Sequence, residues 1–364
     1  MKIPEKMAAA LLTAHGGLDT LKYREDVPVP QPKAGEVLIN VTAAGVNNTD
    51  INTRTAWYSK GVTTATNDGG ATGFDSADDA DASWSGVPLT FPRIQGADVC
   101  GRIVAVGAGV DAGRIGERVI VRSMMRAYAD YRPYECWTFG SECDGGFAQF
   151  TVAPAAETHA VQCDWSDAEL ASIPCAYSTA ENMLHRAGVG AERVLITGAS
   201  GGVGSAAVQL AKRRGAQVIA VCSASKADDV RAIGADRVID RKTDLLSVLD
   251  KNSIDIVVDL VAGETWPVFM ELLRKGGRYV TAGAIGGPIS EIDIRTLYLK
   301  DLTLFGCTFQ EDVVFENLVG YIERGEIRPL VAKTYPLSDI AQAQTDFLSK
   351  SHTGKLVLLP PQVS

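Results

Sequence analysis

Polar and apolar residues alternate over residues 1–50, and Pro and Gly interrupt the alternation at short intervals. The stretch "YREDVPVPQPKAGEVLINV" is typical, and the same pattern returns over residues 94–122. Alternation with a period of two places side chains on opposite faces of a strand, and Pro and Gly mark turns. We therefore predict that the N-terminal part of the chain is built mainly from β-strands.

The segment of residues 59–92 breaks this pattern. It is rich in Gly, Ala, Thr, Ser and Asp, and it contains "NDGGATGFDSADDADASWSG". A segment with so few large apolar residues cannot bury much apolar surface, so we expect a long surface loop.

From residue 165 onward the spacing of apolar residues becomes helical, first in "SDAELASIPCAYSTAENMLHRAG". Short β-branched runs such as "RVLITGA", "QVIAVCS" and "IDIVVDLV" then alternate with helical stretches such as "VGSAAVQLAKRRG". Short buried strands separated by helices predict a parallel sheet. After residue 310 the pattern is mixed again and ends in the strand-like "GKLVLLP". The pattern predicts an α/β fold, and a length of 364 residues favours two domains.

Composition narrows the range of functions. The net charge is −9 and basic residues are scattered, which argues against a nucleic-acid or anionic-membrane partner. No apolar run has the length of a membrane span, and the first residues, "MKIPEKMAAALL", do not resemble a signal peptide. The seven Cys are dispersed, which is typical of reduced thiols inside the cell. We expect a cytoplasmic protein that acts on a small molecule.

A glycine-rich turn lies between the first strand and helix of the parallel sheet, in "VLITGASGGVGSAAVQLAK". Gly201, Gly202 and Gly204 would let the backbone approach a pyrophosphate, with the start of the helix facing the phosphates. Ala199 stands where the usual fingerprint has its first Gly, so the motif is a variant. The motif predicts a dinucleotide site; a tight βαβ turn without a nucleotide is the alternative.

The end of the second strand of this sheet indicates which dinucleotide is bound. A carboxylate there holds the ribose 2′-hydroxyl of NAD(H), but this chain has no Asp or Glu before Asp228. It has Ser223, Ser225 and Lys226 instead, and Arg241 follows the third strand. Hydroxyls and cations suit a 2′-phosphate, so we predict NADP(H) as the cofactor. A solvated lysine at a helix start is the alternative for Lys226.

These features together resemble the medium-chain dehydrogenase/reductase superfamily. The stretches "AGEVLINVTAAGVNNTDI", "GERV", "DGGFAQF", "ASGGVG", "GADRVID" and "GKLVLLP" follow in its order, and the resemblance is greatest to the zinc-free quinone oxidoreductase and enoyl reductase branch. It implies a Rossmann doubly wound parallel-sheet domain inserted into a Gly-rich, β-barrel-like (GroES-like) substrate domain. We expect the substrate domain at residues 1–160, the NADP-binding domain at 161–305, and a return to the substrate domain at 306–364. Members of this superfamily commonly form dimers, although tetramers also occur, so we expect a homodimer and leave the tetramer as the alternative.

Zinc ligands of the zinc-bearing relatives are missing at two positions. Asn47 stands where those relatives have Cys, and Ala97 stands where they have the His of "GHE". The structural zinc of those relatives needs four closely spaced Cys, and the matching stretch here has only Cys136 and Cys143. We therefore expect no metal.

The resemblance implies a different set of catalytic residues after the first long strand. Tyr58 occupies the position of the proton donor in enoyl thioester reductases, and Asn47, Asp50, Asn52 and Arg54 surround it in sequence. A tyrosine is protonated at neutral pH and can donate. Asn47 and Asp50 could equally be turn residues, and Tyr58 could pack against the 59–92 segment. Because that segment adjoins Tyr58, we expect it to form a lid over the substrate cleft.

The resemblance extends the cofactor site beyond the glycine turn. Thr179 matches a residue beside the nicotinamide, although a Thr inside a helix is an equally good interpretation. Ala282, Gly283 and Ala284 match the backbone that meets the nicotinamide amide, and Cys307 would line the same pocket. The remaining implied cofactor positions are Val203, Val261 and Lys355.

We therefore expect a zinc-independent, NADPH-dependent reductase of quinones or α,β-unsaturated carbonyls. An alcohol or aldehyde dehydrogenase of the same fold is one alternative, distinguished by hydride transfer to a saturated carbonyl. A cofactor-binding protein with little activity is another, distinguished by failure to reduce any of a broad set of enones.

Overall fold

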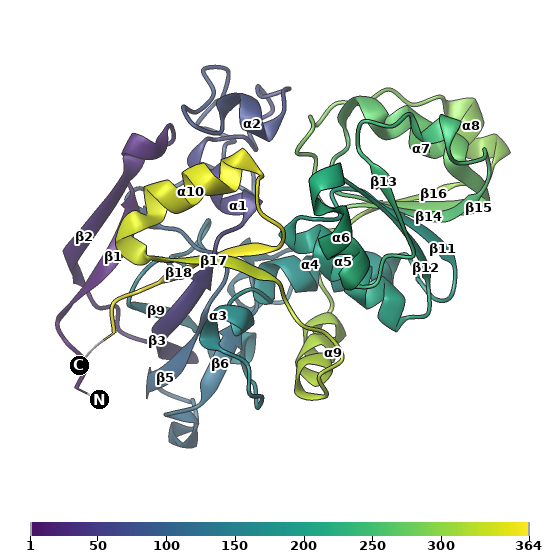
Figure 1. Cartoon of the computed structure of the whole chain (residues 1–364). Helices are drawn as coiled ribbons and strands as arrows, with labels where there is room; N and C mark the ends of the chain where they lie inside the picture. Colours follow the sequence, from purple (N-terminus) through teal and green to yellow (C-terminus); the bar gives the residue numbers. More distant parts are fainter. Residues whose placement is uncertain (1, 363–364) are drawn as a thin grey trace.

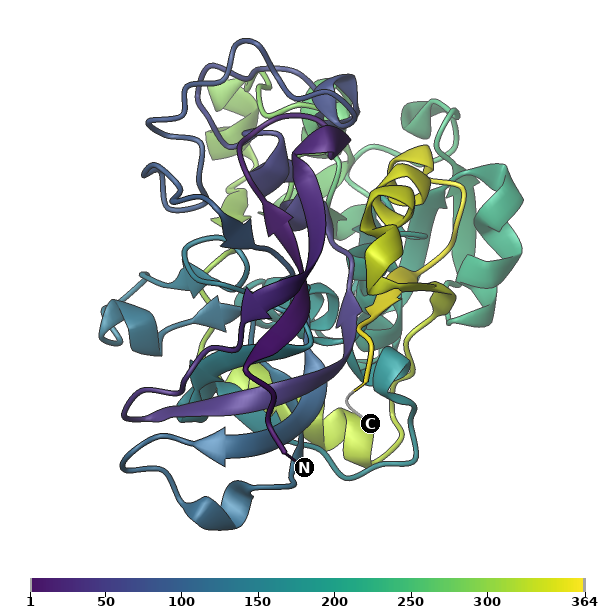
Figure 2. The same cartoon turned by 90° about the vertical axis from the view of Figure 1, so that its left-hand side faces the viewer.

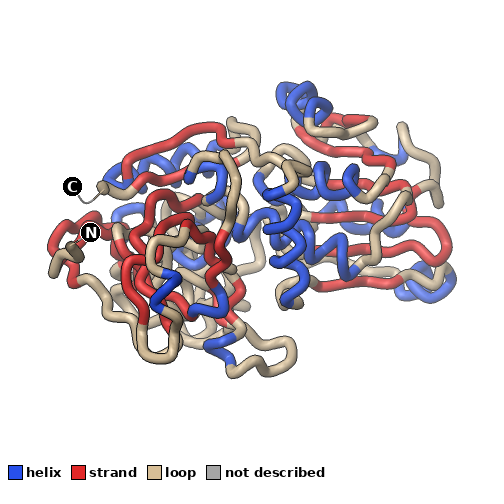
Figure 3. Tube along the Cα trace, turned by 90° about the horizontal axis from the view of Figure 1, so that it is seen from below, coloured by secondary structure: helices blue, strands red, loops and turns tan. Residues whose placement is uncertain are grey.

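The computed structural model describes residues 2–362, which form two lobes (Figure 1). The first lobe is rich in antiparallel strands and includes both the N-terminal part of the chain and the C-terminal strand. The second lobe contains strands interleaved with helices, and Figure 3 shows the two lobes side by side from below. The chain has the predicted α/β fold, with a GroES-like lobe and a Rossmann-type lobe.

The first lobe is built around a seven-stranded sheet whose longest strand, β3 (Glu36–Gly45), is buried along nearly its whole length. The main order along the sheet is β10 (Thr158–Ala160), β6 (Arg118–Val121), β5 (Cys100–Val106), β3, β18 (Lys355–Leu359) and β17 (Val331–Pro336). β9 (Phe150–Pro154) also pairs with β3. A second sheet contains β2 (Leu21–Pro28), β1 (Lys6–Leu12) and β4 (Arg93–Ile94), and a small ribbon contains β7 (Met124–Met125) and β8 (Trp137–Thr138).

Short helices cover this lobe. They are α1 (Asn48–Arg54), α2 (Thr66–Gly69), α3 (Asp167–Leu170) and α10 (Ile340–Ser349). α1 begins where β3 ends, and the Asn47 backbone N–H donates to the Asp50 side chain in a capping box that starts the helix. Asp50 and Arg54 are buried on one face of α1, whereas Asn48 and Asn52 point to the other face, toward the second lobe.

The second lobe is a parallel sheet of six strands. Its order is β13 (Arg237–Asp240), β12 (Gln217–Cys222), β11 (Arg193–Ile196), β14 (Ile254–Asp259), β15 (Leu273–Thr281) and β16 (Thr303–Gly306). The helices of this lobe are α4 (Pro174–Arg186), α5 (Gly202–Arg213), α6 (Ala227–Ala232), α7 (Trp266–Leu272), α8 (Ile294–Leu299) and α9 (Asp312–Glu323). The strand order reverses direction between β11 and β14, which is where doubly wound sheets bind ligands.

The two predicted domain boundaries fall at the end of one strand and inside another. Residue 160 ends β10 in the first lobe, and residue 305 lies inside β16 in the second. α9 follows β16 and packs into the same core as α4, and it also contacts the first lobe, where Arg122 pairs with Asp312 at 2.6 Å. The boundaries at 160 and 305 stay predictions.

The 59–92 segment is more deeply packed than its composition suggests. It rises at the top of the first lobe around α2 (Figures 1 and 2), and it buries Val62, Thr66, Ala82 and Ser83 almost completely. Small side chains make this possible, because they let the backbone come close. A Cβ on Gly70, for example, would lie 2.5 Å from Cδ2 of Leu348. The expectation of a loop that buries little was therefore wrong for these residues.

Arg54 holds this segment in place, and it does not line the cavity between the lobes. Its side chain is fully buried and donates to the carbonyl oxygens of Gly16 (2.7 Å) and Gly70 (2.6 Å) and to Oε1 of Gln344 (2.8 Å). Burial lowers the pKa of the guanidinium to about 10. The predicted catalytic position of Arg54 is corrected accordingly: the helical period turns it into the core, where it joins α10 to two loops.

We predict that Arg54→Ala destabilises the fold. The substitution leaves three buried acceptors unsatisfied, at about 1–3 kcal/mol each, so the free energy of unfolding should fall by about 3 kcal/mol or more. Urea unfolding measures this. Arg24→Ala is the matched control, because Arg24 pairs with Asp26 on the surface, where solvent screens the pair, and its loss should change stability much less. Equal stability of the two variants would contradict the role given to Arg54.

Candidate functional site

A cavity of about 820 Å³ is lined by residues of both lobes. The first lobe contributes α1 and the residues around it, together with Trp84 and Met124. The second lobe contributes the glycine turn before α5 and the loops that follow β12, β13, β14 and β15. The segment between α10 and β18 also lines the cavity, so three distant parts of the chain meet there.

The glycine turn forms one wall of the cavity. Gly201, Gly202, Val203 and Gly204 line it, as predicted, and α5 begins at Gly202. A Cβ on Gly204 would lie 2.1 Å from the carbonyl oxygen of Gly198, so only glycine fits that position. The left-handed residue of the turn is Gly198, with φ of 58°. Ala199 is buried and does not line the cavity, so it cannot contact a ligand there directly.

Three cations gather at the far side of the glycine turn. Lys226, Arg241 and Lys350 all line the cavity, together with Ser223. Burial, and then Arg241, lower the pKa of Lys226, while burial and then Lys226 lower the pKa of Lys350 to about 8. Ser225 does not line the cavity and instead lies 3.5 Å from Ser223 between the two hydroxyl oxygens. The cluster has the charge that an anionic group would need.

The ammonium group of Lys226 already has partners in the structure. It donates to the carbonyl oxygens of Lys350 and His352, both at 2.6 Å. These bonds join the end of β12 to the segment after α10. Lys226 therefore combines a structural link with a position in the cation cluster, which sequence analysis did not anticipate.

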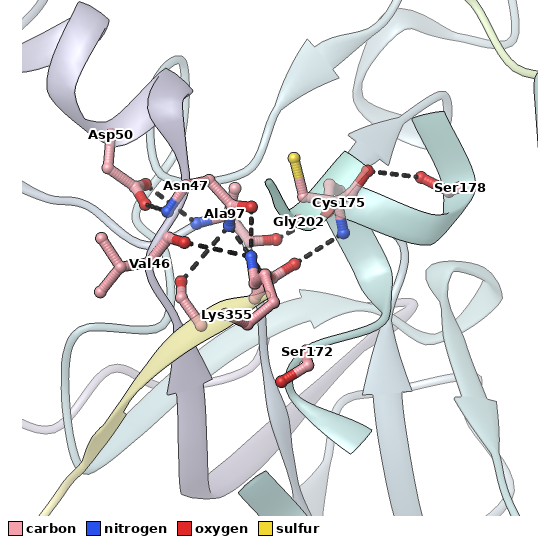
Figure 4. A network of polar contacts seen from close by, with 12 residues as sticks. Val46, Asn47, Asp50, Ala97, Ser172, Cys175, Ser178, Gly202 and Lys355 are labelled. Atoms are coloured by element: carbon pink, nitrogen blue, oxygen red, sulfur yellow. Dashed lines mark hydrogen bonds and ion pairs between the residues drawn. The ribbon is translucent and has the colours of Figure 1, made fainter. Parts of the chain in front are cut away.

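A buried polar network occupies the middle of the cavity wall (Figure 4). The ammonium of Lys355 donates to Oδ1 of Asn47, to Oδ2 of Asp98 at 2.8 Å and to the carbonyl of Val46 at 3.1 Å. Asn47 also donates to Asp98, at 2.8 Å. The other oxygen of Asp98 accepts from the backbone N–H of Cys175, at 2.6 Å, near the start of α4. Asn47 and Lys355 line the cavity, and their predicted catalytic and cofactor-binding roles stay predictions.

Asp50 lies behind this network and does not line the cavity. Its carboxylate accepts from the backbone N–H of Asn47 (2.7 Å) and of Ala97 (3.3 Å). Burial raises the pKa of Asp50 to about 7, although the bond from Asn47 opposes the shift. The predicted catalytic position of Asp50 is thus corrected: it caps α1 and fixes the loop that holds Ala97.

Tyr58 lines the other end of the cavity, and its predicted catalytic role stays a prediction. Its hydroxyl donates to Oγ1 of Thr49 at 2.9 Å. Burial raises the pKa of Tyr58, and hydrogen bonding with Thr49 and Asn52 opposes the rise. The phenol therefore stays protonated at neutral pH and can donate a proton.

Two asparagines complete this end. Oδ1 of Asn52 accepts from Nδ2 of Asn48 and from the hydroxyl of Thr66, both at 3.2 Å. Oδ1 of Asn48 is buried without a hydrogen-bond partner among the described residues. A ligand hydroxyl or amide in the cavity would satisfy that acceptor.

Most other predicted cofactor positions also line the cavity. Thr179, Val261, Ala282, Gly283 and Ala284 do so, but Cys307 does not. Cys307 is buried in the core of the second lobe, where burial raises its thiol pKa to about 11. The strand before it, β16, is at the edge of the sheet, away from the point where the strand order reverses.

Several lining residues were not predicted from the sequence, among them Cys175, Trp84, Met124 and Lys350. Cys175 had a usable signal, since it precedes Thr179 by four residues in a helix and must share its face. Burial, and then Asp98, raise the pKa of the Cys175 thiol, so it stays protonated. Trp84 and Lys350 gave no local signal.

Neither a cluster of metal-type donors nor a membrane-type helix occurs within residues 2–362. No three His, Cys, Asp or Glu side chains within that range gather as a metal ion would require. No helix of the same residues combines the length and apolar character that a bilayer crossing needs.

Comparison with known proteins identifies relatives of the whole chain. Residues 33–163 match the model of the alcohol dehydrogenase GroES-like domain, and residues 202–324 match that of the zinc-binding dehydrogenase domain. The chain is 30% identical to quinone oxidoreductase of Mus musculus, covering 97% of this chain and 98% of the relative. It is 28% identical to acryloyl-coenzyme A reductase of Metallosphaera sedula, covering 92% and 95%. A solved structure from Sinorhizobium meliloti 1021, provisionally named an alcohol dehydrogenase, is 45% identical with a TM-score of 0.87, covering 99% and 98%.

Proposed function

This chain belongs to the medium-chain dehydrogenase/reductase superfamily, in its quinone oxidoreductase-like branch, and from that premise we propose that it is a zinc-independent, NADPH-dependent reductase of quinones or α,β-unsaturated carbonyls. The observation that carries the proposal is the cavity itself. It joins a glycine turn and a cation cluster at one end to a protonated tyrosine at the other.

The residues of the cavity fit a dinucleotide. Gly201, Gly202 and the first turn of α5 would hold the pyrophosphate, because free backbone N–H groups point out of a helix start. Arg241, Lys226 and Lys350 would hold a 2′-phosphate. When bound, NADPH supplies the hydride for reduction of the substrate. Asn48, whose side chain has an unpartnered oxygen, lines the same cavity.

The donor set argues for chemistry without zinc. Asn47 offers a neutral amide, Ala97 offers no donor, and the Cys175 thiol stays protonated. Between them the ammonium of Lys355 already neutralises Asp98. A divalent cation would meet a fixed positive charge there, so the network replaces a metal site rather than leaving one open.

Tyr58 is the group that would complete the reduction. Hydride addition to the β-carbon of an enone leaves negative charge on the carbonyl oxygen and then on the α-carbon. The phenol of Tyr58 stays protonated and is oriented by Thr49, so it can donate a proton to either position. Asn52 holds the side chains of Asn48 and Thr66 in place by accepting a hydrogen bond from each. A quinone depends less on Tyr58, since a hydroquinone anion can take its proton from water.

A homodimer and a cytoplasmic location stay predictions. For the dimer, β16 is an edge strand of the six-stranded sheet, and Tyr298, Leu299 and Leu304 beside it are exposed. An edge strand flanked by apolar side chains suits pairing with the same strand of a second copy.

We predict that Arg241→Ala weakens NADPH selectively. Loss of one charge-assisted hydrogen bond should raise the KM for NADPH by about 10- to 100-fold and leave that for NADH nearly unchanged. Steady-state kinetics with both cofactors measure this, and Lys242→Ala is the matched control because Lys242 does not line the cavity.

Since the pKa of Lys350 is about 8, the wild-type preference for NADPH should also decline as pH rises through 8, where that ammonium loses its proton. A wild-type enzyme that prefers NADH would refute the cofactor assignment.

We predict that Tyr58→Phe lowers kcat on an enone by about 10²- to 10⁴-fold, because only the proton donor is removed. The KM for NADPH should stay within about twofold, and the loss on a para-quinone should be much smaller. Single-turnover reduction of 4-phenyl-3-buten-2-one separates the chemical step from cofactor binding and product release. Enone reduction at the wild-type rate in the variant would remove Tyr58 from the mechanism. Oxidation of a secondary alcohol as efficient as enone reduction would favour an alcohol dehydrogenase instead.

A further inference from the structure

The tyrosine end of the cavity has aromatic walls. The Tyr58 ring lies edge-on to Trp84, with ring centroids 5.1 Å apart and planes at 83°, and edge-on to Trp57, at 5.8 Å and 75°. Met124 lines the same cavity. The aromatic rings offer flat apolar surfaces to a ligand in the cavity, and the sulfur of Met124 adds a polarisable atom.

Trp84 reaches this position from the 59–92 segment. That segment also touches the second lobe, because the N–H of Thr66 donates to the carbonyl of Ile285 at 3.2 Å, and Ile285 lines the cavity as well. The segment is thus attached to both sides of the cavity, and its one tryptophan forms part of the substrate wall.

The carboxylate of Glu142 connects the backbone next to Trp84 with the ribbon that carries Met124. Oε1 of Glu142 accepts from the N–H of Ser85 at 2.9 Å, next to Trp84, and Oε2 accepts from the N–H of Thr138 at 2.8 Å. Thr138 pairs with Met124 across the β7–β8 ribbon, and its hydroxyl lies 3.9 Å from the Met124 sulfur. Glu142 therefore connects two walls of the cavity that are distant in sequence.

The cavity wall formed by residues 46–124 of the first lobe carries no charged side chain. The lining residues between positions 46 and 124 are all uncharged: Val46, Asn47, Asn48, Thr49, Asn52, Trp57, Tyr58, Trp84 and Met124. The charged lining residues all come from the second lobe or from the segment after α10, namely Lys226, Arg241, Asp244, Glu264, Lys350 and Lys355. A substrate phosphate or carboxylate would find no counter-charge on the wall that holds Tyr58.

We propose that Trp84 is a specificity-determining residue, which with Trp57 and Tyr58 selects substrates that carry a flat, uncharged ring over aliphatic enones and over acyl thioesters of a charged carrier. Glu142 is the positioning residue for Trp84. The inference rests on the proposed function, since it specifies the substrate class of the same site. Contact with one indole contributes roughly tenfold in binding.

The test compares three substrates in wild type, Trp84→Ala and Trp84→Phe. With NADPH saturating, kcat/KM is measured for 4-phenyl-3-buten-2-one, 3-penten-2-one and acryloyl-coenzyme A. The wild type should prefer the phenyl enone by tenfold or more. Trp84→Ala should lose about tenfold on the phenyl enone, mainly through KM, and change less than twofold on 3-penten-2-one, with Trp84→Phe between. Trp137→Ala is the matched control, because Trp137 is exposed and does not line the cavity.

The positioning role of Glu142 is tested separately, by the selectivity for the ring-bearing substrate in Glu142 variants. Glu142→Ala should reproduce the loss of selectivity for the ring while the KM for NADPH stays unchanged, and Glu142→Gln, which keeps one acceptor, should show a smaller effect. A fall in thermal stability without a change in the ratio of KM values would reduce Glu142 to a structural residue and overturn its positioning role.

The outcomes separate the two proposals. Turnover of all three substrates without ring preference, or equal losses on ring and aliphatic enones in Trp84→Ala, would overturn the inference and leave the proposed function standing. Absence of NADPH-dependent turnover on any enone or quinone would overturn the proposed function. In that case calorimetric binding of 4-phenyl-2-butanone to the NADP⁺-loaded protein still decides the inference, since Trp84→Ala should weaken it about tenfold and unchanged affinity would overturn it.

Discussion

The buried ammonium of Lys355 is the interaction on which the site depends most. It joins β18 to the start of α1 through Val46 and Asn47, and it neutralises Asp98, which in turn accepts from the backbone at the start of α4. Each of these groups is nearly inaccessible to water. A buried charge that loses its partner costs about 3–5 kcal/mol, so the ammonium and its acceptors form one unit. This unit connects β18 with the starts of α1 and α4, on two sides of the cavity.

The C-terminal segment that carries Lys355 also shapes the dinucleotide end. Gly354 donates to the carbonyl of Ser200 and forms a bridge with Gly201, so the segment lies directly against the glycine turn. Four residues before Gly354, Lys350 enters the cation cluster, and its carbonyl accepts from Lys226. A few residues far from the Rossmann motif in sequence thus complete the proposed anion site. Positive charge is concentrated at this end of the cavity, and the wall formed by residues 46–124 is neutral, which is the division that an anionic cofactor and an uncharged substrate require.

The helical period explains which residues of α1 line the cavity. Positions four apart share a face, so Asn48 and Asn52 line the cavity together, while Asp50 and Arg54 are buried together on the opposite face. The family pattern identified the right stretch of chain but did not assign its residues to faces. Asp50 became a helix cap and Arg54 a core residue that bonds to two loops and α10. The expectation that Cys307 lines the pocket was wrong for a related reason, because Cys307 follows an edge strand and is buried in the core.

The sequence by itself determined the features that depend on neighbours along the chain: the strand-rich N-terminal part, the alternating strands and helices of the parallel sheet, the glycine turn, and the absence of Cys and His at positions 47 and 97. These follow from periodicity and local backbone geometry, which are properties of short stretches. Only the tertiary structure decided which side chains meet. It brought Lys350 to Lys226 and Arg241, Lys355 to Asn47 and Asp98, and Trp84 to Tyr58. Contacts between residues tens to hundreds of positions apart depend on how the lobes and the 59–92 segment pack, and packing depends on the shapes of all the side chains at once.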